Sequence, residues 1–337
     1  MKKRIIYLLL VLSVFLSLVG CGGNDTAETS GETEGGLSGK VTVYMPSPAG
    51  LADKLAAAFT EKTGVEVEQF QGTTGEILAR LEAEKANPVA DVVILASWSD
   101  GLTLKAEGGL ESYTPTAVDK INEGFIDEDH TLFGYSASAV AVIYNTTIIP
   151  ELDADWDELA NADYKDMIAI PDPEKSGAAK DFLAGFVTGL ENGEAIMESW
   201  AANGLIVPGA NKAALEAVTT GEKAILIAGV DYNGYSSIDK GEPLAIYYPA
   251  SGTVINPRPA VIPNTAPNMD NAKAFVDFLF SEEAQQMVAD AYLLPGVNDV
   301  KADNRSNLDE IPVIPADWDK MMGIASETAA KLNEICK

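Results

Sequence analysis

The fold is decided by the order of segments in residues 41–95, which read VTVYMPSPAGLADKLAAAFTEKTGVEVEQFQGTTGEILARLEAEKANPVADVVIL. Three segments have the short apolar pattern of strands, and two have the apolar spacing of amphipathic helices. Strands are expected at 41–45, 65–70 and 91–95, and helices at 51–62 and 77–86. The third strand is a continuous apolar run, which is typical of burial on both faces. This alternation predicts a parallel, doubly wound α/β sheet.

A second series of strands and helices follows from residue 139. Strands are expected at 139–144, 167–170, 224–228, 244–248 and 259–262, and helices at 178–190, 195–202, 212–219, 272–280 and 282–291. The 337 residues exceed what one core usually organises, and 47% of them are hydrophobic, which is enough for two cores. The chain is therefore expected to fold as two lobes.

The N-terminal segment has the features of an export signal. The sequence KKR at residues 2–4 precedes an apolar run at 5–19, which is too short for a stable membrane span. The run ends in LVGC at 18–21, which resembles the lipobox of bacterial lipoproteins. The resemblance implies cleavage before Cys21 and a diacylglycerol on its sulfur, and an uncleaved anchor helix is the alternative. Either outcome holds the chain at the outer face of the cell membrane.

The residues after Cys21 predict a tether. Residues 22–38 contain no aromatic side chain and one large aliphatic one, so they bury too little apolar surface to offset the entropy of ordering. The only other cysteine is Cys336, so an intrachain disulfide is excluded once Cys21 carries lipid.

Charge and histidine content exclude several classes of function. The formal net charge is −28, and loss of the three positive residues at 2–4 leaves −31. The electrostatic field of this negative charge opposes binding to nucleic acid and to anionic lipid, and it favours solubility. The single histidine, His130, excludes His-rich metal sites and makes histidine-based catalysis a poor hypothesis.

Five short sequences occur along the chain in this order: TTGE at 73–76, EAEKANPVADV at 82–92, PDPEKSG at 171–177, AFVDFLFSEEAQ at 274–285 and LPGV at 294–297. Together they resemble the type II periplasmic binding proteins, within the branch of ferric-iron, phosphonate and sugar-phosphate receptors of ABC importers. The resemblance implies two α/β lobes, each with a doubly wound sheet, joined at the hinge by two crossover strands near 138–144 and 253–262. A ligand in the cleft would close the lobes and create the surface that docks on the permease subunits.

The resemblance and the composition together predict the division of the chain. The expected parts are a lipoprotein signal peptide at 1–20, a flexible acidic tether at 21–39, a first part of lobe 1 at 40–138, lobe 2 at 139–252, a return to lobe 1 at 253–300, and a C-terminal helical segment at 301–337.

The first candidate binding segment is Gly72-Thr73-Thr74-Gly75, at a strand-to-helix junction. The glycines permit close approach of the backbone, the hydroxyls are donors, and a helix N-terminus attracts anions. Plain helix capping is the alternative, because Thr73 with Glu76 fits the capping box. The two roles are compatible.

The second candidate segment contains Ser176, Gly177 and Ala178. Ser176 is expected to cap the helix and donate to a ligand, with the amides of Gly177 and Ala178 free, and a turn closed by Ser176 alone is the alternative. In the two-lobed fold this segment would face the first one, so that two helix N-termini close on one anion.

Residues that follow the expected strands are further candidates, because ligands gather at the carboxyl ends of strands in open α/β sheets. Ser47 follows the first strand, and Ser97 and Trp98 follow the third. Trp98 is equally interpretable as a core or hinge aromatic. Ser136 and Ser138 flank the first crossover and are weaker candidates.

Asp231, Tyr232 and Tyr235 bear on the identity of the ligand. Ferric receptors of this branch carry adjacent tyrosines here, whereas this chain reads DYNGY at 231–235, which makes a ferric site doubtful. Asp231 could hold an amine or hydroxyls of a phosphonate or sugar phosphate, with a surface or capping carboxylate as the alternative. Arg258 could reach a phosphate or extend to solvent.

The sequence contains no complete catalytic constellation and no cofactor or metal motif, so no enzyme activity is expected. The leading hypothesis is a monomeric, lipid-anchored solute-binding protein that delivers a small phosphonate or phosphorylated solute to an ABC permease. The alternatives are a ferric-iron receptor of such an importer and, in a different class, a non-transporting sensor.

Overall fold

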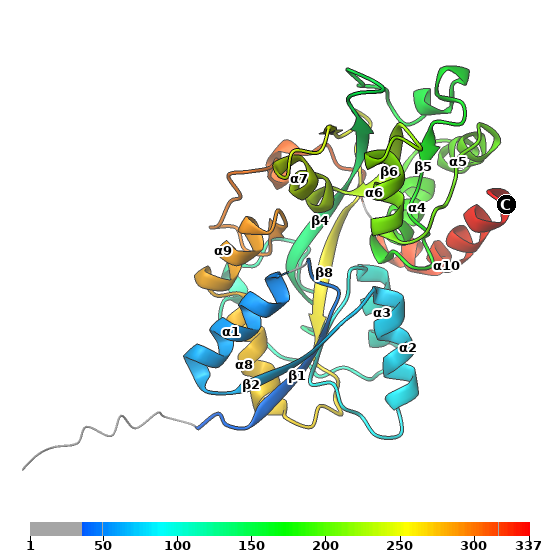
Figure 1. Cartoon of the computed structure of the whole chain (residues 1–337). Coiled ribbons are helices and arrows are strands. Elements are labelled where there is room, and N and C mark those ends of the chain that lie inside the picture. The colour runs from blue at the N-terminus through cyan, green and yellow to red at the C-terminus, as the bar shows by residue number, and fades with distance from the viewer. Residues whose placement is uncertain (1–35, 49, 316) are drawn as a thin grey trace, which may run out of the picture. The chain divides into compact units, whose positions relative to one another are not determined.

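The computed structural model describes residues 36–48, 50–315 and 317–337 (Figure 1). Leu37–Lys337 form one compact unit. The expected signal peptide, the lipid attachment at Cys21 and most of the expected tether lie outside the described residues.

The described residues form ten α-helices, nine strands and four short 3₁₀ turns. The helices are α1 (Leu51–Thr63), α2 (Thr74–Glu84), α3 (Trp98–Ala106), α4 (Gly177–Gly189), α5 (Gly193–Ala202), α6 (Asn211–Thr219), α7 (Asp231–Asp239), α8 (Met269–Leu279), α9 (Glu282–Asp290) and α10 (Trp318–Ile335). The strands are β1 (Lys40–Met45), β2 (Glu66–Gln71), β3 (Val92–Ile94), β4 (Phe133–Asn145), β5 (Ile168–Ala169), β6 (Ile225–Val230), β7 (Leu244–Tyr247), β8 (Ile255–Val261) and β9 (Leu294–Pro295). The 3₁₀ turns are η1 (Val118–Lys120), η2 (Glu158–Ala160), η3 (Ala162–Tyr164) and η4 (Leu308–Glu310).

Every strand and helix expected from the sequence is present, with ends shifted by a few residues. Helix α2 begins earlier than its apolar spacing predicted, at Thr74, because Thr73 caps it. Helix α1 ends where Gly64 adopts a left-handed φ of 75° and donates its N–H to the Thr60 carbonyl. Helices α3 and α7 were not expected from the sequence.

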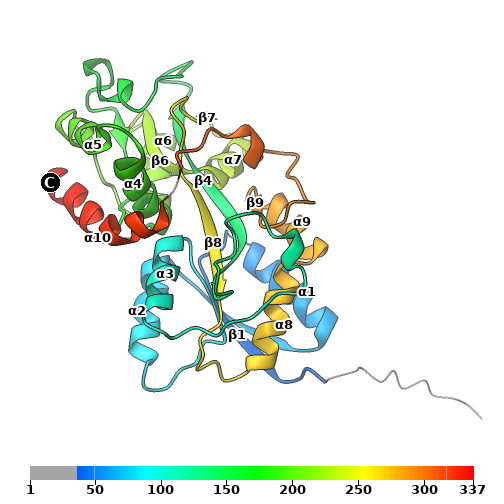
Figure 2. The ribbon, with the colours of Figure 1, turned by 180° about the vertical axis from the view of Figure 1, so that it is seen from behind.

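Strand β4 belongs to two sheets. The strand order is β2-β1-β3-β8-β4-β6-β5, with β7 and β9 also paired to β4. The first half of β4 pairs with β8 and β9 in the first sheet, and the second half pairs with β6 and β7 in the second. Both views show β4 and β8 side by side through the middle of the molecule (Figures 1 and 2). The expected two-lobed α/β fold is confirmed.

The pairing within the sheets is mixed rather than wholly parallel. Strand β1 pairs in parallel with β2 and β3, as expected from their helical connections. Strand β8 returns late in the chain and pairs antiparallel with both β3 and β4.

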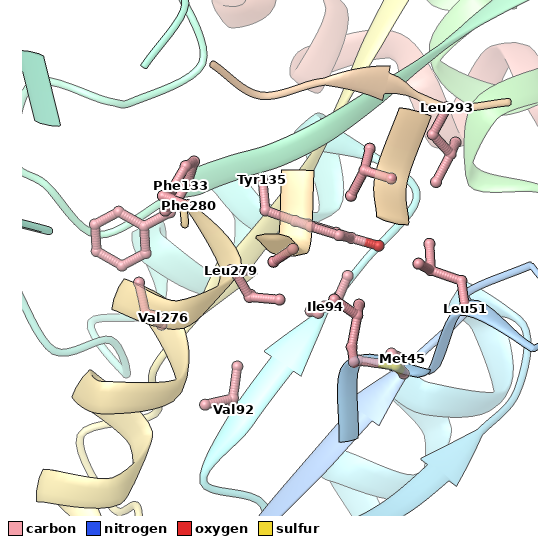
Figure 3. Close-up of a cluster of buried hydrophobic side chains, with 14 of the residues drawn as sticks. Met45, Leu51, Val92, Ile94, Phe133, Tyr135, Val276, Leu279, Phe280 and Leu293 are labelled. Carbon is pink, nitrogen blue, oxygen red and sulfur yellow. The ribbon is translucent and has the colours of Figure 1, made fainter. Parts of the chain in front are cut away.

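Helices cover both faces of each sheet. One face of the first sheet packs on α1 and α8, and Figure 3 shows part of this core, with Met45 of β1, Val92 and Ile94 of β3, and Val276 and Leu279 of α8. The other face packs on Ile77 of α2 and Trp98 of α3. The second sheet has an aromatic core on one face and α6 on the other; the core contains Trp156, Phe182, Phe186 and Trp200. Each sheet is therefore the middle layer of three.

Candidate functional site

A cavity of about 240 Å³ lies where loops of the first sheet meet helices of the second. The first-sheet side consists of segments that follow β1, β2 and β3, and the second-sheet side consists of the first turns of α4, α6 and α7. The lining residues are Pro46, Ser47, Gly72, Thr73, Thr74, Ala96, Lys175, Ser176, Gly177, Ala210, Asn211, Lys212, Tyr232 and Asn233.

Four helices begin at this cavity. The N-terminal ends of α2, α4, α6 and α7 all contribute lining residues, one helix from the first sheet and three from the second. The first backbone N–H groups of a helix have no intrahelical acceptor, and the helix dipole places partial positive charge there. The helix ends therefore place partial positive charge at the wall of the cavity.

The α2 junction shows the predicted capping box. The Thr73 hydroxyl accepts the N–H of Glu76 at 3.3 Å, and the Glu76 carboxylate accepts the N–H of Thr73 at 2.7 Å. The hydrogen bond from the Thr73 N–H to the carboxylate, with a smaller contribution from the Thr73 side chain, lowers the pKa of Glu76. The Thr74 hydroxyl accepts the N–H of Ala96 at 3.1 Å and so joins α2 to the end of β3. Capping and a place in the cavity coexist at this segment.

The α4 junction is joined to the start of α6. The Ser176 hydroxyl accepts the N–H of Ala179 at 3.2 Å and donates to Oδ1 of Asn211 at 2.8 Å. A Cβ on Gly177 would lie 2.7 Å from Cβ of Ser97, so only glycine permits this approach of α4 to the first sheet. The sequence did not predict that Ala210, Asn211 and Lys212 line the cavity, because α6 has no side-chain cap to mark its start.

Seven of the candidate residues lie in the cavity lining: Ser47, Gly72, Thr73, Thr74, Ser176, Gly177 and Tyr232. Gly75 and Ala178 lie next to lining residues in α2 and α4 but are not part of it. The other five candidates, Ser97, Trp98, Ser138, Asp231 and Tyr235, are placed elsewhere.

Ser97 and Trp98 belong to a buried contact between α3 and α4. The Asp181 carboxylate, from α4, accepts hydrogen bonds from the Ser97 hydroxyl at 3.1 Å, from the Trp98 N–H at 2.8 Å and from the Ser99 hydroxyl. Burial, together with the charge of Asp100, raises the pKa of Asp181 to about 7. The Trp98 indole is buried and lies 6.3 Å from the Trp318 ring, as its core alternative predicted.

Asp231 and Tyr235 belong to a buried network around Arg305. The Asp231 carboxylate pairs with the Arg305 guanidinium at 2.6 Å, and both side chains are wholly buried. It also accepts the N–H of Ala139 at 3.2 Å and the Tyr248 hydroxyl at 3.0 Å. The Tyr235 hydroxyl lies 3.3 Å from that of Tyr248. Because Asp231 is 0% exposed, its surface alternative is wrong.

Ser138 lies on a buried polar face of the paired strands β4 and β8. Ser136 is opposite Arg258, and Ser138 is opposite Asn256. Arg258 is 1% exposed, so the alternative that it extends to solvent is wrong. Its guanidinium donates to the Pro46 carbonyl at 2.5 Å and lies 5.8 Å from the centre of the Tyr232 ring.

Two features are absent from the described residues. No group of three or more histidine, cysteine, aspartate or glutamate side chains is arranged to hold a metal ion in that part of the chain. None of its helices combines the length and the apolar character needed to cross a membrane.

The chain is similar to known extracellular receptors. The sequence profile of the family described as bacterial extracellular solute-binding protein matches residues 87–322. The chain is 26% identical over 294 residues to iron uptake protein A1 of Synechocystis sp., covering 81% of this chain and 79% of that one. It is 24% identical over 244 residues to the putative 2-aminoethylphosphonate-binding periplasmic protein of Salmonella paratyphi A, covering 69% and 70%.

A solved structure shows the same fold. The periplasmic binding protein AfuA from Actinobacillus pleuropneumoniae, with exogenous fructose-6-phosphate bound, superimposes with a TM-score of 0.78 at 23% identity, covering 88% of this chain and 97% of that one. The profile match spans more than half of the sequence, so this chain belongs to the bacterial extracellular solute-binding proteins, the substrate-binding components of ABC importers, and it is not an enzyme.

Proposed function

We propose that this protein captures a small anionic solute, a phosphonate or a phosphorylated compound, in the cavity between its two sheets. The observation that carries the proposal is the convergence of four helix N-termini on one cavity. A relative named as a 2-aminoethylphosphonate-binding protein and a structural neighbour with fructose-6-phosphate support the same class of ligand.

Local charge offsets the acidity of the chain at this cavity. The formal net charge is −28, so an anion is repelled by the molecule as a whole. Lys175 and Lys212 both line the cavity, and Lys175 pairs with Asp172 at 2.8 Å. Lys212 forms no ion pair within the described residues. Its charge is therefore available to a bound anion.

A ferric ion is the second candidate ligand. It is favoured by the relative named iron uptake protein A1 and by the position of Tyr232 in the lining. Burial raises the pKa of Tyr232, which favours the neutral phenol over the iron-binding phenolate. A visible tyrosinate-to-iron charge-transfer band would support ferric binding, and its absence at saturating ferric citrate would remove this candidate.

We also propose that Cys21 carries a diacylglycerol that holds the monomeric receptor beside its permease. The sequence LVGC at 18–21 supports this, although it lies outside the described residues. Mass spectrometry of the membrane fraction should find a mature chain that begins at lipid-modified Cys21, and Cys21→Ser should leave the membrane fraction. A wild-type chain that keeps residues 1–20 would contradict the proposal.

The first test of the ligand class is a thermal-shift screen of the protein purified from membranes in detergent. The panel contains 2-aminoethylphosphonate, fructose 6-phosphate, inorganic phosphate, ferric citrate and a polyamine. A ligand at a hundred times its Kd adds about 2.7 kcal/mol of stability, or roughly 5 °C for a protein of this size. We expect the shift with a phosphorus compound. A shift with the polyamine alone would contradict the proposal.

The variant Lys212→Glu tests the position of the anion in the same screen. Reversing this unpaired charge should weaken binding of the phosphorus compound about tenfold, because a favourable charge contact becomes a repulsive one. Lys165→Glu is the matched control, since Lys165 is exposed, forms no ion pair within the described residues and does not line the cavity. Equal weakening by both variants would show a general charge effect and no local contact.

A further inference from the structure

The crossover strands carry four polar side chains on one face. Residues directly opposite each other in a sheet point to the same side, as do residues two apart in a strand. Ser136 is paired with Arg258, and Ser138 with Asn256. The four side chains therefore share a face of the β4–β8 pair, and each is at most 1% exposed.

These side chains have hydrogen-bonding atoms without partners. The hydroxyls of Ser136 and Ser138, both polar atoms of the Asn256 amide and Nε of Arg258 make no hydrogen bond with any described residue. Buried polar groups are nearly always satisfied, and leaving one unsatisfied is costly. A cluster of five such atoms on adjacent residues is therefore unexpected in a purely structural part of the protein.

Within the described part of the chain, the two buried arginines differ in their partners. Arg305 pairs with the Asp231 carboxylate at 2.6 Å. Arg258 has no carboxylate partner among the described residues, and its one protein hydrogen bond goes to the Pro46 carbonyl. A buried charge without a countercharge destabilises a protein unless a ligand supplies that countercharge.

Arg258 joins this polar face to the wall of the cavity. Arg258 contacts Pro46 through a hydrogen bond and faces the ring of Tyr232, and both of these residues line the cavity. The face is also built on β4, the strand that pairs in both sheets, so it lies where a hinge movement of the lobes would change what covers it.

We propose that Arg258, with Ser136, Ser138 and Asn256, forms the subsite that fixes the anionic group of the solute, and that Arg258 is its countercharge. The inference rests on the proposed function and deepens it. The free Nε–H of Arg258 lies on the edge of the guanidinium that binds two oxygens of a phosphoryl or phosphonyl group at once. The two hydroxyls and the amide supply further donors, while the helix N-termini and Lys212 contact the same anionic group from the cavity side.

The test measures affinity and unliganded stability of the full protein for Arg258→Gln and Arg258→Lys. The probes for calorimetry are 2-aminoethylphosphonate, fructose 6-phosphate and inorganic phosphate. Arg258→Gln should weaken binding about a hundredfold, in the range seen when one partner of a buried charge pair is removed. Arg258→Lys should recover part of this loss, because lysine restores the positive charge but lacks the planar guanidinium that binds two oxygens at once. Ser136→Ala and Ser138→Ala should each weaken binding a few-fold.

Melting of the unliganded protein separates a ligand-binding role from a structural one. Arg258→Gln should melt within about 2 °C of the wild type or higher, because it removes an unpaired buried charge. Arg305→Gln, the matched control, should melt far lower, because it leaves Asp231 unpaired. If Arg258→Gln lowers the melting temperature as Arg305→Gln does, Arg258 is a structural residue and the inference is wrong.

Failure of the inference and failure of the proposed function give different results. If the wild type binds a phosphorus probe and Arg258→Gln binds it equally well, the subsite is wrong and the ligand class stands. If none of the three probes binds the wild type, both proposals are overturned. Loss of binding in Arg258→Gln with unchanged unliganded melting is the result that supports both.

Discussion

Asp231→Ala should lower the free energy of unfolding by about 3–5 kcal/mol, because it leaves the buried Arg305 guanidinium without its countercharge. The variant also removes the acceptor for the Tyr248 hydroxyl and for the N–H of Ala139 in β4. Urea unfolding followed by tryptophan fluorescence measures the change.

The double variant Asp231→Ala/Arg305→Met is the control for this prediction. It removes both charges, so it should be considerably more stable than the sum of the two single variants predicts. Additive effects, or a loss below about 1 kcal/mol for Asp231→Ala, would show that this ion pair is not the stabilising element that its geometry indicates.

Asp181→Asn should remove a large pH dependence of stability. The folded chain keeps the proton on Asp181 up to about pH 7, whereas the unfolded chain loses it near the ordinary value of 3.8. Between these values the folded chain binds more protons, so the free energy of unfolding falls as pH rises. Across this pH window, Asp181 lowers the free energy of unfolding by about 4 kcal/mol. Asparagine carries no charge, and its side-chain oxygen still accepts hydrogen bonds from the donors at the start of α3.

The difference between the wild type and Asp181→Asn, measured by urea unfolding at several pH values, isolates this effect. Other carboxylates, such as Asp127 and Asp172, have lowered pKa values and stabilise the fold less as pH falls, but they act equally in both proteins. Asp119→Asn, at an exposed position, is the matched control and should leave the profile unchanged. If the difference in the free energy of unfolding between the two proteins stays constant from pH 4 to pH 8, Asp181 does not have the raised pKa described here.

The fold was predictable because its signals are local. The apolar spacing of α1 and the continuous apolar run of β3 each reflect the burial that the structure shows. The Thr73–Glu76 capping box also marked the start of α2. The alternation of such segments was enough to predict an α/β fold.

Two helices were missed because tertiary contacts outweigh their weak intrinsic propensity. Helix α7 reads DYNGYSSID, in which glycine and serine oppose a helix. It forms where Asp231 is fixed by Arg305 and where a Cβ on Gly234 would lie 2.7 Å from Ile246. Helix α3, with a glycine and two polar residues in its first turn, is held by Asp181.

The candidate site was predictable at the segments that end strands and begin helices. Ser47, Thr74 and Ser176 were found in this way, since such segments gather at one edge of a sheet. The buried states of Asp231 and Arg258 were not predictable, because they depend on partners far along the chain. Arg258 acquires its surroundings only when β8 pairs with β4 and Pro46 folds over it.

The position of β8 between β3 and β4 fixes the order in which the two sheets are completed during synthesis. A nascent chain emerges from its N-terminus, so β1, β2 and β3 appear before any strand of the second sheet. The second sheet needs nothing beyond β7, which ends at Tyr247, whereas the first sheet stays divided until residues 255–261 insert between β3 and β4. Non-local pairing of this kind is slow and leaves strand edges exposed. The sheet that emerges first is thus closed after the other, and its early strands keep exposed, aggregation-prone edges until residues 255–261 arrive.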